Sequence, residues 1–236
     1  MELIRAADDL VENLAKLTFP PPVDCAYNPL IYARATYDEY LRRYAHPGIE
    51  AVLLGMNPGP FGMAQTGVPF GDCAAVRNWL GIQGSVGKPE CEHPKRRIQG
   101  FDCPRSEVSG TRVWGWARDR FGTPEAFFRR FFVANYCPLC FMEKSGRNLT
   151  PDKLPAAERE KLFAACDEHL RQVIACLHPR WVIGIGEFAR KRAAIALQGT
   201  HVQIAGILHP SPASPVANRG WAEQAEQQLR QLGLNV

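Results

Sequence analysis

Three polar side chains lie at the ends of apolar runs in this 236-residue sequence: Asn57, Asn135 and His209. An asparagine amide both donates and accepts hydrogen bonds, so it can orient a water molecule or recognise the edge of a base. A histidine can donate to an oxygen on which negative charge develops. Two amides and an imidazole suit a neutral base or a phosphodiester as ligand.

Familiar catalytic and nucleotide-binding motifs are missing around these residues. The sequence has no GxGxxG or Walker motif, so a dinucleotide or a nucleoside triphosphate would lack its usual phosphate cradle. The turn Asn57-Pro58-Gly59 permits close backbone approach but brings no lysine. A GxSxG elbow and a pair of carboxylates at strand ends are also missing, which disfavours acyl transfer and ordinary glycosidase chemistry.

The elements that must position these side chains can be predicted from hydrophobic patterning. Four compact apolar runs predict buried parallel strands, at 51–57, 131–136, 181–186 and 203–209. Helices are expected at 155–177 and 187–197, between and after the strands, and an amphipathic helix at the N-terminus. This order predicts the α/β class, as one domain over 1–236: a three-layer α/β/α sandwich around a short four-stranded parallel sheet.

In open parallel sheets, ligands bind beyond the carboxyl ends of the strands. Asn57, Asn135 and His209 all lie at such ends, so we expect them to meet at one edge of the sheet.

Composition narrows the setting of this site. Hydrophobic residues make up 46% of the chain and charged residues 22%, a globular balance. The N-terminal stretch contains acidic residues and no uninterrupted apolar run, so neither a signal peptide nor a membrane span is expected. We expect an intracellular monomer that does not bind a membrane.

The eight cysteines raise the question of a metal. Cys137 and Cys140 form a C-x-x-C, but no second pair or nearby histidine pair completes a four-ligand site. We therefore expect no metal and no cofactor, and cysteines present as reduced thiols. A redox or metal protein centred on Cys137 and Cys140 remains an alternative.

The net charge of +4 is mild, but basic residues cluster between Gly81 and Gly110. Lys95, Arg96 and Arg97 are consecutive, with Arg105 nearby. The cluster is either a solvated loop or a surface that contacts phosphates. On the second interpretation, Lys95, Arg96 and Arg97 would contact the phosphates of a nucleic acid.

Two long motifs resemble those of a known family. The segments 55–72, GMNPGPFGMAQTGVPFGD, and 209–221, HPSPASPVANRGW, are similar to signature motifs of the single-strand-selective monofunctional uracil-DNA glycosylases, within the uracil-DNA glycosylase superfamily. The resemblance extends from about Pro29 to Trp221 and includes Asn135 in VANYCPL. The four spaced cysteines of the iron–sulfur branch of that superfamily are not present.

The resemblance implies a monofunctional glycosylase of base excision repair, which flips uracil out of single- or double-stranded DNA. Asn57 resembles the residue that holds the attacking water, and His209 the residue that hydrogen-bonds uracil O2 as the base departs. Asn135 resembles the residue that pairs with O4 and N3–H and rejects cytosine. No lysine occupies a signature position, so the abasic site is expected to stay uncleaved.

The resemblance also assigns the walls of the base pocket. Phe70 resembles the aromatic residue that stacks on the flipped base, and Phe61 is expected to help wall the pocket. Met56 and Met63 bound a stretch whose backbone amides are candidates for contacting the base. Gly59 stands where the best-known uracil-specific branch has a tyrosine, which implies room for 5-hydroxymethyluracil, with xanthine as a further candidate substrate.

The segment 211–220 resembles the family's wedge, which enters duplex DNA and fills the gap left by the flipped base. Its candidate DNA-binding residues are Pro212, Ala213, Ser214, Pro215 and Asn218. Animal members carry an arginine in place of Ala213, so weaker penetration of duplex DNA is expected. A module on the same fold that binds bases or DNA without catalysis is the alternative function.

Overall fold

The computed structural model describes residues 2–236. Its main sheet has four parallel strands, β2 (Ala51–Gly55), β3 (Phe131–Asn135), β6 (Trp181–Ile185) and β7 (Gln203–Ile207), in the order β3-β2-β6-β7. Strands β2 and β6 at the centre are apolar and almost wholly buried, as expected for a parallel sheet covered on both faces.

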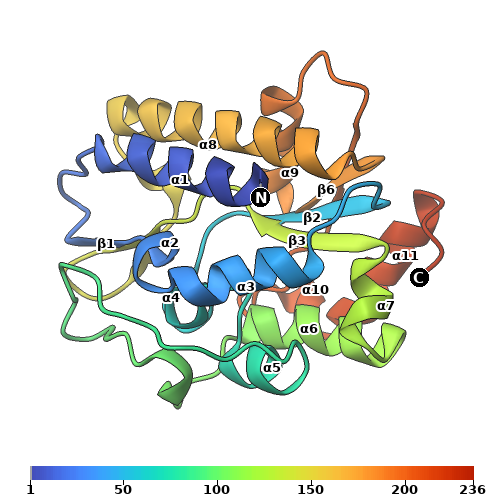
Figure 1. The fold of residues 1–236 in the computed structure, drawn as a ribbon, viewed down its shortest axis with the longest axis horizontal. Helices are drawn as coiled ribbons and strands as arrows, with labels where there is room; N and C mark the ends of the chain where they lie inside the picture. Colours follow the sequence, from blue (N-terminus) through green and yellow to red (C-terminus); the bar gives the residue numbers. More distant parts are fainter. Residues whose placement is uncertain (1) are drawn as a thin grey trace.

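Helices cover both faces of this sheet (Figure 1). On one face, α1 (Glu2–Ala15) lies beside α8 (Ala156–Leu177), and α9 (Glu187–Ala196) packs on β6 and β7. On the other face lie α3 (Arg34–Tyr44) and α6 (Val108–Phe121). The predicted three-layer α/β/α sandwich around a four-stranded parallel sheet is confirmed.

The remaining helices are α2 (Pro29–Tyr32), α4 (Met63–Thr66), α5 (Cys73–Asn78), α7 (Pro124–Phe128), α10 (Pro215–Asn218) and α11 (Trp221–Gln231), with short 3₁₀ turns at Gly100–Asp102 and Pro151–Lys153. The long helices predicted from periodicity are present within one or two residues of the expected bounds. Helix α8 begins directly after Pro155 and ends where His178 adopts a left-handed conformation.

The strands end earlier than the apolar runs suggested. β2 ends at Gly55 and β7 at Ile207, two residues before Asn57 and His209. Beyond the strands, the amides of Tyr136 and Cys137 still donate to the carbonyl oxygens of Gly55 and Met56. The polar side chains therefore lie in loops that the sheet holds in place.

A second, antiparallel sheet was not predicted. It consists of β1 (Cys25–Tyr27), β4 (Cys140–Met142) and β5 (Asn148–Leu149), in the order β1-β4-β5. These strands have two or three residues each, too few to show an alternating pattern in the sequence.

The expectation that the cysteines are reduced thiols is wrong for Cys25 and Cys91, which form a disulfide. Strand β1 and the basic loop bring their Cα atoms to 6.3 Å, although 66 residues separate them in sequence. Cys137 and Cys140 are free and buried, and burial raises the pKa of the Cys140 thiol to about 12. Within residues 2–236, no group of three or more His, Cys, Asp or Glu side chains could hold a metal ion.

Across residues 2–236, none of the helices is both long enough and apolar enough to span a membrane.

Candidate active site

A cavity of about 340 Å³ opens at the carboxyl ends of the parallel strands. It is lined by Met56, Asn57, Pro58, Gly59, Met63, Phe70, Glu107, Ser109, Asn135, Asn148, Thr150, His209 and Ser211. The three polar residues selected from the sequence thus share one cavity with Phe70, Met56, Met63 and Gly59. Its volume suits a single nucleobase with its sugar.

Asn57 is held in one orientation by its neighbours. Its Nδ2 donates to the carbonyl oxygen of Leu139 at 3.1 Å and to that of Pro58 at 3.3 Å. The amide nitrogen is therefore occupied by the backbone, which leaves Oδ1 to accept a hydrogen bond. An oxygen acceptor in this position can orient a water molecule but cannot take a full proton from it.

Asn135 and Phe70 meet over Gly55. In the sheet, Gly55 pairs with Asn135, the last residue of β3. A Cβ atom at Gly55 would overlap Oδ1 of Asn135 and lie 2.5 Å from Cε2 of Phe70. Only glycine lets the amide and the aromatic ring approach each other at this strand end.

The backbone of Phe70 is also unusual. Its φ is +54°, a left-handed conformation that few residues other than glycine adopt. Gly110 on α6 packs directly against the carbonyl group of Phe70, where a Cβ atom would collide with its oxygen. Strain held by tight packing at a cavity wall is characteristic of functional positions.

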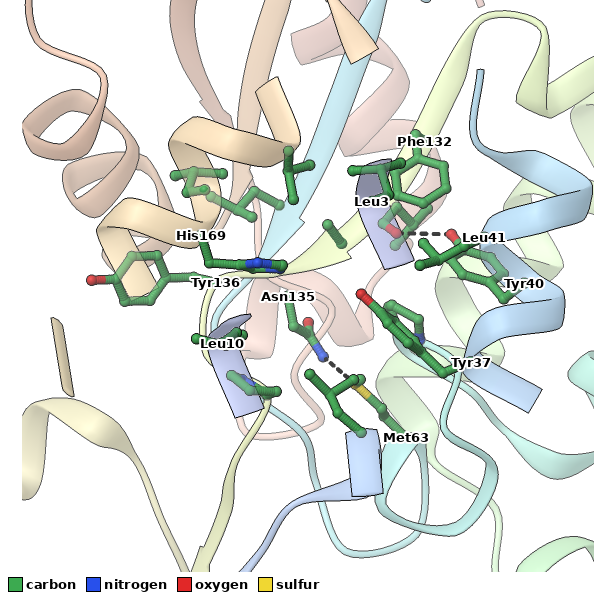
Figure 2. A pocket seen from close by; sticks show the side chains of 18 residues that line it. Leu3, Leu10, Tyr37, Tyr40, Leu41, Met63, Phe132, Asn135, Tyr136 and His169 are labelled. Carbon is green, nitrogen blue, oxygen red and sulfur yellow. Dashed lines mark hydrogen bonds between the residues drawn. The ribbon is translucent and has the colours of Figure 1, made fainter. Parts of the chain in front are cut away.

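Asn135 also borders a second, internal cavity, of about 30 Å³ (Figure 2). Its Nδ2 donates to Sδ of Met63 at 3.3 Å, and both residues line both cavities. Tyr37 and His169 line the inner cavity from α3 and α8. The contact with Met63 fixes the amide of Asn135 with its nitrogen toward α4 and its oxygen toward Gly55.

His209 follows β7 and packs on Gly186, whose φ is +93°. A Cβ atom at Gly186 would lie 3.1 Å from Cβ of His209, so glycine gives the imidazole its place. Burial lowers the pKa of His209 below its ordinary value, which favours the neutral ring. Neither ring nitrogen hydrogen-bonds another residue of the described chain, so both remain available to a ligand.

The space beside Gly59 is open. No atom would lie within 4 Å of a Cβ atom built on this residue, although Gly59 lines the cavity.

Four further polar residues line the cavity that the sequence reasoning missed: Glu107, Ser109, Asn148 and Thr150. Glu107 caps α6 by accepting hydrogen bonds from the amides of Ser109 and Gly110, and burial raises the pKa of its carboxyl. An acidic residue directly before a helix is a common N-cap, but the sequence analysis expected no helix here and so did not use this signal. Asn148 belongs to the small sheet that was not predicted, and Thr150 to the segment after it. Neither stretch carries a sequence pattern that would have identified these residues.

Phe61 does not line the cavity. The guanidinium groups of Arg96 and Arg105 instead lie over its ring. Lys95 and Arg97 are exposed on the same basic loop, outside the cavity.

The segment 211–220 projects beside His209 and is braced from α6. Arg112 donates to the carbonyl oxygens of Pro210 and Ser211 at 3.0 and 3.3 Å and to Oδ1 of Asn218 at 2.8 Å. Nδ2 of Asn218 donates to the carbonyl oxygen of Pro212. The side chain of Asn218, predicted to bind DNA, therefore already stabilises the loop at both of its ends.

The other residues of this segment have different surroundings. Ser214 caps α10 by accepting a hydrogen bond from the amide of Ala217. Pro212, Ala213, Pro215 and Val216 are exposed, so the segment presents an apolar surface before the exposed polar residues Asn218 and Arg219. An exposed apolar tip on a braced loop suits insertion between bases.

Known proteins share this fold and these motifs. A family model described as the uracil DNA glycosylase superfamily matches residues 43–230. The "Single-strand selective monofunctional uracil-DNA glycosylase" of Rattus norvegicus is 53% identical over 94% of this chain and 81% of its own length. The corresponding protein of Bos taurus is 49% identical over 95% of this chain and 84% of its own length.

A crystal structure of Pedobacter heparinus SMUG2 has the same fold, with a TM-score of 0.66 at 18% identity, over 97% of this chain and 98% of that one. The fold and the family model define a member of the uracil-DNA glycosylase superfamily, a class of glycosidases. Within it, the chain belongs to the single-strand selective monofunctional family and is a uracil-DNA glycosylase, a hydrolase of N-glycosyl bonds.

Proposed function

We propose that this enzyme removes uracil and 5-substituted uracils, 5-hydroxymethyluracil among them, from DNA and leaves an intact abasic site. The observation that carries the proposal is the convergence of Asn57, Asn135, His209 and Phe70 on one base-sized cavity. Glycosidic cleavage builds negative charge on the departing base and positive charge on the sugar. The cavity offers a group for each of these needs.

Each group has a separate task in this proposal. Phe70 stacks on the flipped base, while Asn135 donates to O4 and accepts from N3–H, a pattern that cytosine reverses. His209 hydrogen-bonds O2 as the bond breaks, and its buried position strengthens that interaction. The side-chain nitrogen of Asn57 is held by the carbonyl oxygen of Leu139, so Oδ1 faces the cavity. This oxygen orients the water that attacks the cationic sugar.

The substrate range is proposed from the open space beside Gly59. A hydroxymethyl group at C5 fits there and can replace the hydrogen bonds of displaced water, whereas a methyl group cannot. Xanthine, a larger base, is a further candidate. Gly59→Tyr should keep uracil excision and reduce excision of 5-hydroxymethyluracil by at least about 10-fold. This corresponds to a rise of about 1.4 kcal/mol in the activation free energy for the larger base.

Single-stranded DNA is proposed as the preferred substrate, with duplex DNA cut more slowly. The related mammalian proteins are named for single-strand selectivity. Ala213, exposed at the tip of the segment 211–220, offers neither charge nor bulk to hold a gap in a duplex open.

The direct test is release of free base from single-stranded oligonucleotides that contain one uracil. The wild-type enzyme should release uracil and leave a strand that breaks only after alkali. His209→Ala and Asn57→Ala should lower the single-turnover rate about 100-fold or more with DNA affinity retained, as expected for removal of groups that act in the transition state. Binding without release would favour a non-catalytic module, and a nick before alkali would contradict monofunctional chemistry.

A further inference from the structure

Two arginines of the basic loop, Arg96 and Arg105, lie over one aromatic ring outside the cavity. Cζ of Arg105 lies 4.3 Å from the centre of the Phe61 ring, and Cζ of Arg96 lies 5.4 Å from it. A cation over an aromatic face is held by about 0.5–1 kcal/mol at an exposed site. The ring therefore anchors two positive charges that would otherwise move with long side chains.

These charges are not neutralised within the protein. Within residues 2–236, Arg34, Arg130 and Arg192 are among the arginines that form ion pairs with carboxylates, whereas Arg96 and Arg105 form none. Nη1 of Arg96 donates to the carbonyl oxygen of Lys95 at 3.0 Å, and its buried Nε has no hydrogen-bond acceptor. An uncompensated pair of fixed guanidinium groups is suited to an external anion.

A fully buried side chain, that of Gln65, connects the basic loop that carries Arg96 to the turn that follows Asn57. Its Nε2 donates to the carbonyl oxygen of Pro60 at 2.8 Å and to that of Arg97 at 3.1 Å. Its Oε1 accepts from the amides of Gln99 and Gly100. Three of the four hydrogen bonds of the amide thus go to the basic loop and one to the turn that follows Asn57.

The position of Phe61 sets which anion can reach it. Phe61 is two residues from Gly59, and Arg105 is two residues from Glu107, so both adjoin residues of the cavity wall. Two residues span at most about 7 Å. The phosphates of one strand follow each other at intervals of about 3.4 Å along a helix. The phosphate of a nucleotide next to the flipped one would therefore lie within about 7 Å of the cavity wall, close enough to reach the two arginines.

We propose that Arg96 and Arg105, held over Phe61, form a binding site for backbone phosphates of the strand that carries the flipped base. The inference rests on the proposed glycosylase function and adds the site that holds the neighbouring nucleotides. Single-stranded DNA lacks a second strand to fix its course, so an anchored pair of charges beside the cavity keeps the target nucleotide in register.

Binding of a uracil-free single-stranded oligonucleotide at several salt concentrations tests the charges. Arg96→Gln and Arg105→Gln should each raise Kd about 5-fold at low salt and make the slope of log K against log salt shallower by about 0.7 per lost phosphate contact. Phe61→Leu keeps both charges but loosens them, so Kd should rise about 3-fold with little change in slope. Arg180→Gln, before β6 at the opposite edge of the sheet, is the matched control and should change neither quantity.

A scan with single neutral methylphosphonate linkages on both sides of uracil identifies the contact. The linkage that weakens wild-type binding should have no further effect on Arg105→Gln, because the charge pair is already lost. Wild-type affinity and slope in both arginine variants, or additive effects at every linkage, would overturn the inference. Uracil release by the wild-type enzyme and by Arg180→Gln from an oligonucleotide of the same sequence with one uracil, measured beside the binding curves, separates this outcome from failure of the glycosylase proposal.

Discussion

The side-chain nitrogen of Asn57 lies 3.1 Å from the carbonyl oxygen of Leu139, the residue before β4. A residue next to the small antiparallel sheet thereby orients Asn57, which follows strand β2 of the main sheet. With its nitrogen bound to Leu139 and Pro58, Asn57 presents only its oxygen to the cavity. In the proposed mechanism, this hydrogen bond lets the amide direct a water molecule without acting as a base.

Asn57→Asp should therefore slow excision, even though a carboxylate would be a stronger base than an amide. An aspartate cannot donate to Leu139, and its charge would face two carbonyl oxygens. Loss of such a partly buried hydrogen bond costs about 1–3 kcal/mol, which predicts a single-turnover rate about 5- to 150-fold lower. The rate is to be measured with saturating enzyme. A variant at least as fast as wild type would show that the hydrogen bond to Leu139 is not what positions the water.

Gly55→Ala should disable the site and spare most of the fold. The added methyl group would overlap Oδ1 of Asn135 and the ring of Phe70, so both must move away from the base. We expect uracil excision to fall about 100-fold or more, as displacements of about 1 Å at a reacting site commonly do. The melting temperature and the single-turnover rate are the measurements.

Gly115→Ala is the matched control for that variant. Gly115 lies within α6, and a Cβ atom there would meet nothing within 4 Å. It should keep full activity and gain about 0.5–1 kcal/mol of stability, because alanine favours the helix. If Gly55→Ala were as active as this control, the close approach at Gly55 would have no role in catalysis.

Patterning predicted the main sheet well because each buried strand is a continuous apolar run, and parallel strands end at one edge. That rule alone was enough to select Asn57, Asn135 and His209 before any geometry was known. The same reasoning could not find Asn148, since β5 has two residues and depends on pairing with β4. Short strands without periodicity are specified by contacts distant in sequence.

Side-chain partners were also beyond the reach of patterning. Phe61, expected at the cavity wall, lies under two arginines, one of them more than forty residues away in sequence. The disulfide between Cys25 and Cys91 joins positions with no local motif in common. Spacing in sequence shows which residues share an element, but not which elements bring two side chains together.

The stability of the protein should depend on pH through His169. Burial lowers the pKa of this histidine to about 4 from an ordinary 6.5, and its Nδ1 lies 3.2 Å from the carbonyl oxygen of Ala6. Between these values the unfolded chain binds a proton that the folded chain does not. The free energy of unfolding should therefore fall by about 3 kcal/mol as pH drops from above 6.5 through 4.

His169→Gln removes this titration, so its free energy of unfolding should vary less with pH over the same window. Urea unfolding of both proteins at several pH values measures the difference. An unchanged pH dependence in the variant would assign the loss of stability in acid to other groups.

Ala213→Arg should improve action on duplex DNA. Ala213 is exposed at the tip of the segment 211–220, so an arginine there would project into solvent without disturbing the core. Its bulk and charge would fill the gap left by a flipped base and contact the backbone. The ratio of kcat/KM for duplex to that for single-stranded substrate should rise about 10-fold, equal to one charged contact of about 1.4 kcal/mol. An unchanged ratio would mean that residue 213 does not enter the duplex.

Arg112→Lys should lower duplex activity more than single-strand activity. Arg112 holds Pro210, Ser211 and Asn218 with one planar group, and a lysine ammonium cannot reproduce that geometry. A loosened loop must be ordered each time it enters a base stack, so kcat/KM on duplex substrate should fall about 10-fold, for a loss of about 1.4 kcal/mol of preorganisation. Single-stranded substrate, which leaves no stacked gap to fill, should be affected about 3-fold or less.

Arg118→Lys, on the exposed side of α6, serves as the control. Equal losses on both substrates would place the role of Arg112 at His209 itself, through the adjoining Pro210, and not in the entry of the loop into a duplex.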